Sequence, residues 1–165
     1  MEQEYGMKYR RFFAMIAVST AAMFGLMYVN TFSFDHVLFS ETRFWMAFVM
    51  GACMAVIMLS FMLGMYSDRK KNILIYVGAL VVFIAALYLV RSQQTIDDVD
   101  FMKAMTPHHS IAIMTAERAH IRDPRVRKLA KEIIEAQRRE ISEMKYLIAQ
   151  IEEHGVRAAD AGEER

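Results

Sequence analysis

The chain has 165 residues and a formal net charge of +1, with 20 basic side chains interleaved among 19 acidic ones. This balance excludes the broad basic field that nucleic-acid binding requires, so we expect no nucleic-acid partner. The single cysteine, Cys53, excludes an intrachain disulfide framework.

Three apolar segments occupy the first half of the chain, at about residues 12–32, 44–66 and 72–90. Each is free of Asp, Glu, Lys and Arg, and each is close to the roughly 20 residues that a membrane-spanning helix needs. The sequence therefore predicts a membrane domain over residues 1–91, with three transmembrane helices in a lipid bilayer.

The basic residues beside these segments predict an orientation. They gather before the first segment and between the second and third, at Lys8, Arg10, Arg11, Arg69, Lys70 and Lys71. Because loops rich in Lys and Arg stay in the cytoplasm, the N-terminus and the second loop should be cytoplasmic. Everything after Arg91 should lie on the other side. We therefore expect a multi-pass protein of a bacterial inner membrane with a periplasmic C-terminal domain.

Methionines recur every four residues along the second apolar segment, at Met46, Met50, Met54, Met58 and Met62. Flexible methionine side chains commonly fill irregular gaps between helices. The alternative is a track of thioethers for a soft ion such as Cu(I) or Ag(I). A smaller possibility of a metal site is the Asp35–His36 pair in the first loop, which we otherwise expect to be solvated.

Residues 92–155 carry the signals of a helical domain, and residues 156–165 are expected to form a disordered tail. Thr95 is expected to cap a short helix that ends near Met105, and the Thr106–Pro107 pair to start a second helix. Asp123 and Pro124 repeat this signature before a long third helix, which Gly155 should end.

The third helix is amphipathic, but three residues interrupt its apolar face: Gln137, Glu140 and Met144. A buried amide and a buried carboxylate are costly unless they have partners. These side chains therefore indicate either polar contacts inside a bundle or a binding site.

Two thioethers and two imidazoles lie within eight residues, at Met102, Met105, His108 and His109. On a helical wheel, His109 and His120 fall on the apolar side of the second helix, together with Ile113. Such soft and borderline ligands suit Cu(I) or Ag(I) better than Mg²⁺ or Ca²⁺.

Glu117 and His120 offer a different metal chemistry, because they form a Glu-x-x-His pair. Ferritin-like dinuclear sites take this motif from two helices and one Glu from each of two others. A homodimer would supply both pairs and two copies of Glu140, which would suit iron or manganese.

Residues 98–144 read DVDFMKAMTPHHSIAIMTAERAHIRDPRVRKLAKEIIEAQRREISEM. This stretch resembles the domain of unknown function 305, whose pattern is an Asp, Phe-Met, Met-x-Pro-His-His, Ala-Ile and a later Gln-x-x-Glu-Ile-x-x-Met. The resemblance implies a ferritin-like helical fold and periplasmic copper or silver binding through the Met and His positions, in a membrane-tethered branch of the family.

These observations predict an all-α protein, with three transmembrane helices followed by a short ferritin-like helical hairpin or half-bundle. We expect a binding protein for Cu(I) or Ag(I) in metal tolerance or delivery, with ligands among Met102, Met105, His108, His109, Met144, Gln137 and Glu140. The alternatives are the dinuclear iron or manganese protein and a structural or interaction module without metal. The sequence shows no nucleophile–base arrangement and no Gly-rich phosphate loop, so we do not expect an enzyme.

A second copy of the chain is the expected partner of the C-terminal domain. Short helices cannot cover the whole apolar face of the long third helix, and a unit of this size is marginally stable alone. We therefore expect a homodimer that completes a four-helix bundle.

Overall fold

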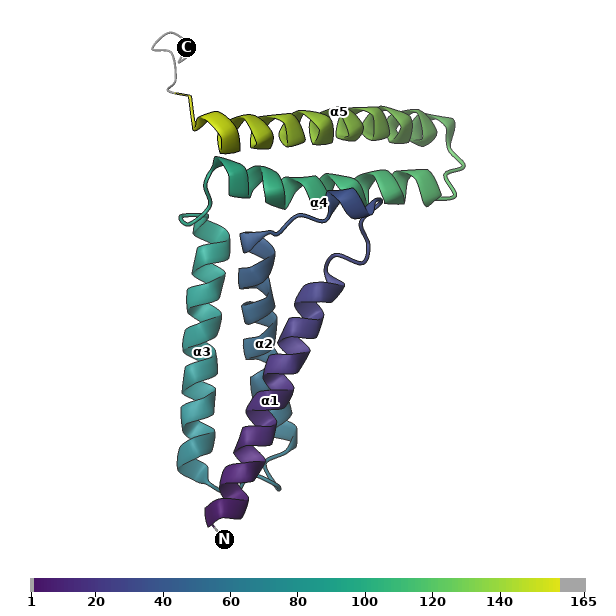
Figure 1. The fold of residues 1–165 in the computed structure, drawn as a ribbon. Coiled ribbons are helices and arrows are strands. Elements are labelled where there is room, and N and C mark those ends of the chain that lie inside the picture. The colour runs from purple at the N-terminus through teal and green to yellow at the C-terminus, as the bar shows by residue number, and fades with distance from the viewer. Residues whose placement is uncertain (1, 158–165) are drawn as a thin grey trace. The chain divides into compact units, whose positions relative to one another are not determined.

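The computed structural model describes residues 2–157, and the regular elements in this range are all helical (Figure 1). In chain order they are α1 (Glu2–Leu26), the short 3-10 helix η1 (Phe34–His36), α2 (Glu41–Phe61), α3 (Arg69–Ser92), α4 (Asp98–Arg118) and α5 (Pro124–His154). This confirms the all-α class for the described residues. The predicted disordered tail falls almost entirely outside them.

The chain forms two compact units. The first unit comprises Met1–Val29 and Glu41–Thr95, and the second comprises Asn30–Ser40 and Ile96–Arg165. The sequence placed the segment Asn30–Ser40 in the membrane domain, with residues 30–32 at the end of the first apolar segment and the rest in a loop. In the structure this segment packs with α4 and α5 instead, so it belongs to the same compact unit as these helices.

Within the described residues, α2 and α3 are the two helices long and apolar enough to cross a membrane. The prediction of three transmembrane helices is wrong for the first segment, because α1 starts in the charged N-terminal region and ends at Leu26. Its apolar part covers residues 12–26, which span roughly 22 Å at 1.5 Å per residue. That length is short of the roughly 30 Å hydrocarbon core of a bilayer.

The first unit is built around α2, which packs against both α1 and α3 (Figure 1). Phe12 of α1 and Leu59 of α2 are fully buried in its core, next to Ile75 of α3. Gly51 of α2 permits the close approach of α1, since an added Cβ would lie 2.5 Å from the Thr20 Oγ1 atom. Most large apolar side chains of α3 point outward and are exposed, as a lipid-facing surface requires.

The second unit is an antiparallel hairpin of α4 and α5, with η1 beside α4 (Figure 1). Its core consists of Met102 and Ile113 from α4 with Ile141, Met144 and Ile148 from α5. Phe32 and Leu38, from the segment Asn30–Ser40, pack against this core. The hairpin therefore takes part of its apolar core from a segment that lies more than 55 residues earlier in the chain.

The predicted helix boundaries hold for α5 and fail for α4. Asp123 caps α5 by accepting a hydrogen bond from the Arg125 N–H, and Gly155 ends the helix with a positive φ of 79°. In contrast, α4 runs without interruption through Pro107, which is buried inside it. Its cap is Asp97, which accepts from the Asp100 N–H, and not Thr95.

Candidate metal site in the hairpin

A groove of about 490 Å³ runs along the α4–α5 hairpin. It brings together side chains that the sequence singled out on both helices, namely Met102 and His109 from α4 with Glu140 and Met144 from α5. The rest of its lining consists of Asp98, Phe101, Glu143, Leu147 and Ile151. The groove therefore combines two thioethers, one imidazole and carboxylates against an apolar wall.

His109 is the most unusual polar group of this groove. Its Nδ1 atom is buried and lies 3.2 Å from Glu140 Oε2, but the geometry makes no hydrogen bond and Nδ1 has no other hydrogen-bond partner. Burial lowers the pKa of His109 below 6.5, although the Glu140 carboxylate opposes this effect. The ring is therefore neutral near pH 7, and neutral imidazole is the form that binds metals.

The two methionines of the groove are also part of the hairpin core. Met102 and Met144 are both buried, and both pack with Ile113 and Ile141. Met105 is half-buried and packs against the same core, but it is not among the side chains that line the groove. The two thioethers therefore line the same groove as His109, and their burial in the core restricts their rotamers.

The remaining predicted ligands lie elsewhere. His108 is exposed, with its ring centroid 6.2 Å from that of His109, and Gln137 is half-buried on α5 outside the groove lining. Glu117 accepts a hydrogen bond of 2.6 Å from Arg138 Nη2. The helical prediction for His120 is wrong, because α4 ends at Arg118 and leaves His120 exposed in the following loop.

The part of the protein that the structure describes holds no cluster of three or more His, Cys, Asp or Glu side chains that could hold a metal ion. The groove offers the thioethers of Met102 and Met144, which as ligands suit a soft ion better than a hard one.

The methionine ladder of α2 contributes to packing at one end. Met58 and Met62 pack against the core of the first unit, whereas Met46 is exposed. This arrangement is what gap-filling methionines require. The ion track through Met46, Met50, Met54, Met58 and Met62 stays a prediction.

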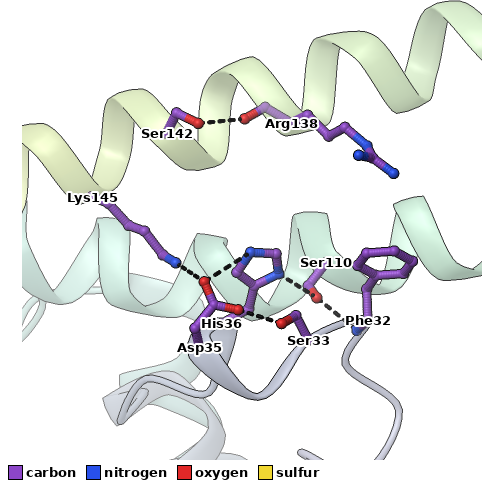
Figure 2. Close-up of polar contacts among 8 residues, drawn as sticks. All are labelled: Phe32, Ser33, Asp35, His36, Ser110, Arg138, Ser142 and Lys145. Carbon is purple, nitrogen blue, oxygen red and sulfur yellow. Dashed lines mark hydrogen bonds and ion pairs between the residues drawn. The ribbon is translucent and has the colours of Figure 1, made fainter.

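A second polar cluster joins the segment Asn30–Ser40 to the hairpin (Figure 2). Ser110 of α4 is fully buried, and its Oγ lies 2.8 Å from the Phe32 N–H donor nitrogen and 2.9 Å from His36 Nδ1. Lys145 of α5 donates to Asp35 Oδ2 at 2.5 Å. Sequence reasoning missed Ser110 and Lys145, since a serine and a lysine on helices give no signal of a partner so distant in the chain.

Comparisons with known proteins extend this description. Residues 97–164 match the family model described as Domain of unknown function (DUF305). "Uncharacterized protein L153" of Acanthamoeba polyphaga mimivirus is 28% identical over 142 residues, which cover 82% of this chain and 91% of that protein. No solved structure gives a significant match.

Neither match indicates a catalytic family. The similarity to the mimivirus protein extends beyond the family match into the apolar half of the chain, because it covers 82% of the residues. The family match agrees with the resemblance read from residues 98–144: the C-terminal part of this chain is similar to the DUF305 family.

Proposed function

We propose that the hairpin binds a soft metal ion, Cu(I) or Ag(I), in the groove between α4 and α5, and that α2 and α3 anchor it to a membrane. The observation that carries the proposal is the His109 Nδ1 atom, which is buried without a hydrogen bond in a groove lined by Met102 and Met144. A buried polar atom without a hydrogen bond is costly, and a bound ion would offset this cost.

The side chains of the groove fit such an ion. Met102, Met144 and His109 would hold it, since thioethers and imidazole are soft and borderline ligands that select Cu(I). Glu140 Oε2 lies 3.2 Å from the same His109 Nδ1 atom, so its carboxylate would offset the positive charge of an ion bound there. Met105, His108 and Gln137 lie outside the groove lining, so we assign them no direct contact with the ion.

The chain order of the anchor supports a non-cytoplasmic position for the hairpin. The segment Asn30–Ser40 precedes α2 and residue 96 follows α3, so two consecutive crossings return both segments to the same side. Arg69, Lys70 and Lys71 lie at the opposite ends of these helices, which assigns those ends to the cytoplasm. In a bacterial inner membrane the hairpin is then periplasmic, where it would serve metal tolerance or delivery.

A second copy of the chain is the partner that we propose for the uncovered side of the hairpin. Phe101 and Leu147 are exposed where they line the groove, and Val126 and Leu129 continue the exposed apolar surface along α5. Pairing two hairpins would cover this surface and give a ferritin-like four-helix bundle. In lipid nanodiscs, sedimentation should give a dimer that Leu129→Gln weakens, and a wild-type monomer at high concentration would contradict the pairing.

The experiment is a Cu(I) titration of the full chain in detergent micelles under reducing conditions, in competition with a chromogenic Cu(I) chelator. The full chain is needed because Phe32 and Leu38 complete the core of the hairpin. We expect tight binding that His109→Gln and Met144→Leu each weaken strongly. Glu140→Gln should weaken it by roughly 10- to 100-fold, because it removes the negative charge beside the ion.

Met114→Leu is the matched control, because Met114 lies half-buried on α4 outside the groove lining. The exchange of Met for Leu preserves volume and costs little stability, so a loss at Met144 alone identifies a ligand. Unchanged Cu(I) affinity in His109→Gln and Met144→Leu would refute the site. A preference for Fe(II) that depends on Glu117 and Glu140 would favour the dinuclear protein, and no metal binding would leave a structural or interaction module.

A further inference from the structure

The segment Asn30–Ser40 is held on the hairpin by one buried hydroxyl group. Figure 2 shows the Ser110 side chain between Phe32 and His36, with Oγ 2.8 Å from the Phe32 nitrogen and 2.9 Å from His36 Nδ1. The Phe32 N–H can only donate, so Ser110 Oγ accepts this hydrogen bond. Ser110 is fully buried, so water cannot replace either partner.

The hydroxyl group has a single proton, and this fixes the protonation state of His36. Of the two hydrogen-bond partners that the described residues give Ser110 Oγ, the Phe32 N–H can only donate, so His36 Nδ1 is the group that can accept the buried hydroxyl proton, and it does so only while it carries no hydrogen. The ring proton lies on Nε2, which is 3.7 Å from Asp35 Oδ2. A protonated imidazole carries hydrogen on both nitrogens and could only donate to Ser110 Oγ, which would leave the buried hydroxyl proton without an acceptor.

The charges around His36 act in opposite directions on its pKa, because the Asp35 carboxylate favours the protonated ring and Lys145 opposes it. Lys145 of α5 already pairs with Asp35, the one carboxylate that faces the ring on its own segment. Arg138 of α5 adds a second cation, with its guanidinium 5.5 Å from the Phe32 ring centroid and paired with Glu117 of α4. The His36 side chain is 13% exposed, and burial lowers its pKa below 6.5.

We propose that the Ser110–His36 hydrogen bond is a pH-sensitive latch, which holds Asn30–Ser40 on the hairpin while His36 is neutral and releases it when His36 takes up a proton. This segment joins α1 to α2, so the latch makes their connection respond to the pH around the hairpin. The inference does not depend on metal binding, because it uses neither His109 nor the methionines of the groove.

The direction of the pH dependence follows from the two shifted groups of the latch. The pKa of His36 is lowered in the docked state, so docking is strongest above pH 6.5 and weakens as the pH falls below that value. The pKa of Asp35 is lowered to about 2, mainly by the hydrogen bond from Lys145. Asp35 therefore stays charged between pH 7.5 and pH 5, so a change in docking over this range is assigned to His36.

Residue-resolved hydrogen exchange of the full chain in micelles tests the latch through the Phe32 amide, which is the donor to Ser110. After correction for the intrinsic exchange rate, its protection should fall several-fold between pH 7.5 and pH 5, since each pKa unit corresponds to about a tenfold change in the docking equilibrium. His36→Gln keeps an acceptor but does not titrate, so its protection should not vary with pH. His154→Gln, at an exposed histidine of α5, should behave as wild type.

Three results would overturn the proposal: an unprotected Phe32 amide at pH 7.5, protection that is constant down to pH 5, or an unchanged pH dependence in His36→Gln. If His36→Gln does not fold, an NMR titration of the His36 ring in the wild-type chain decides the question. A pKa below 6.5 supports the latch, and a pKa at or above 6.5 refutes it.

Discussion

The contribution of Phe32 to the hairpin gives the sharpest stability prediction. Replacing a fully buried Phe with Ala costs about 3–5 kcal/mol, and Phe32 is half-buried, so roughly half of this loss applies. The contact between the Arg138 guanidinium and the Phe32 ring adds about 0.5–1 kcal/mol. Phe32→Ala should therefore destabilise the hairpin by about 2–3 kcal/mol.

Hydrogen exchange of the core amides of α5, such as Ile141, measures this loss in the full chain. At about 1.4 kcal/mol per tenfold change, protection should fall by roughly 30- to 150-fold. Phe34→Ala is the matched control, because Phe34 lies in the same segment but is 96% exposed, and it should leave protection unchanged. Equal effects of the two substitutions would refute the claim that Asn30–Ser40 shares the core of the hairpin.

Two further predictions concern helix packing and helix capping. Gly51→Ala should destabilise the α1–α2 contact by up to about 2 kcal/mol, since overpacking against Thr20 outweighs the gain in helix propensity. Gly78→Ala should not, because an added Cβ there meets no neighbour within 4 Å. Equal melting temperatures of the two variants in micelles would contradict the close approach. Asp97→Ala should destabilise α4 by about 1 kcal/mol and Thr95→Ala should not, because Asp97 is the residue that caps the helix. Thermal unfolding followed by circular dichroism compares the stability of the two variants. A larger loss of stability in Thr95→Ala would count against this cap.

Local signals were sufficient to predict α5. The Asp123–Pro124 start, Gly155 at the end and the apolar stripe between them all indicate the same helix, and the tertiary contacts agree with it. The same signals misled for α4, where Pro107 suggested a helix start. Burial of Thr106 and Pro107 in the hairpin stabilises a continuous helix in spite of the missing N–H.

The candidate site could be predicted only where helical periodicity applies. Periodicity placed His109, Glu140 and Met144 on the inward faces of their helices, and the groove contains all three. It placed His120 inward as well, but this required a helix that in fact ends at Arg118. The docking of Asn30–Ser40 could not be predicted, because a contact between His36 and Ser110 has no periodic signal in the sequence.

The first apolar segment shows that composition alone was not sufficient to predict a membrane span. Composition is continuous from residue 12 to residue 32, and a window of this length predicts a membrane span. The helix nevertheless ends at Leu26, and Phe32 leaves the apolar run to pack on the hairpin core. Hydrophobicity alone does not distinguish a residue that faces lipid from one that joins a protein core.

X-ray absorption at the copper edge of the Cu(I)-loaded full chain tests the proposed function most directly, because it identifies the ligand atoms. The thioethers of Met102 and Met144 and the imidazole of His109 predict a shell of sulfur and nitrogen, which should lose sulfur in Met144→Leu and nitrogen in His109→Gln. A shell of oxygen and nitrogen alone, unchanged by both substitutions, would contradict soft-metal binding in this groove.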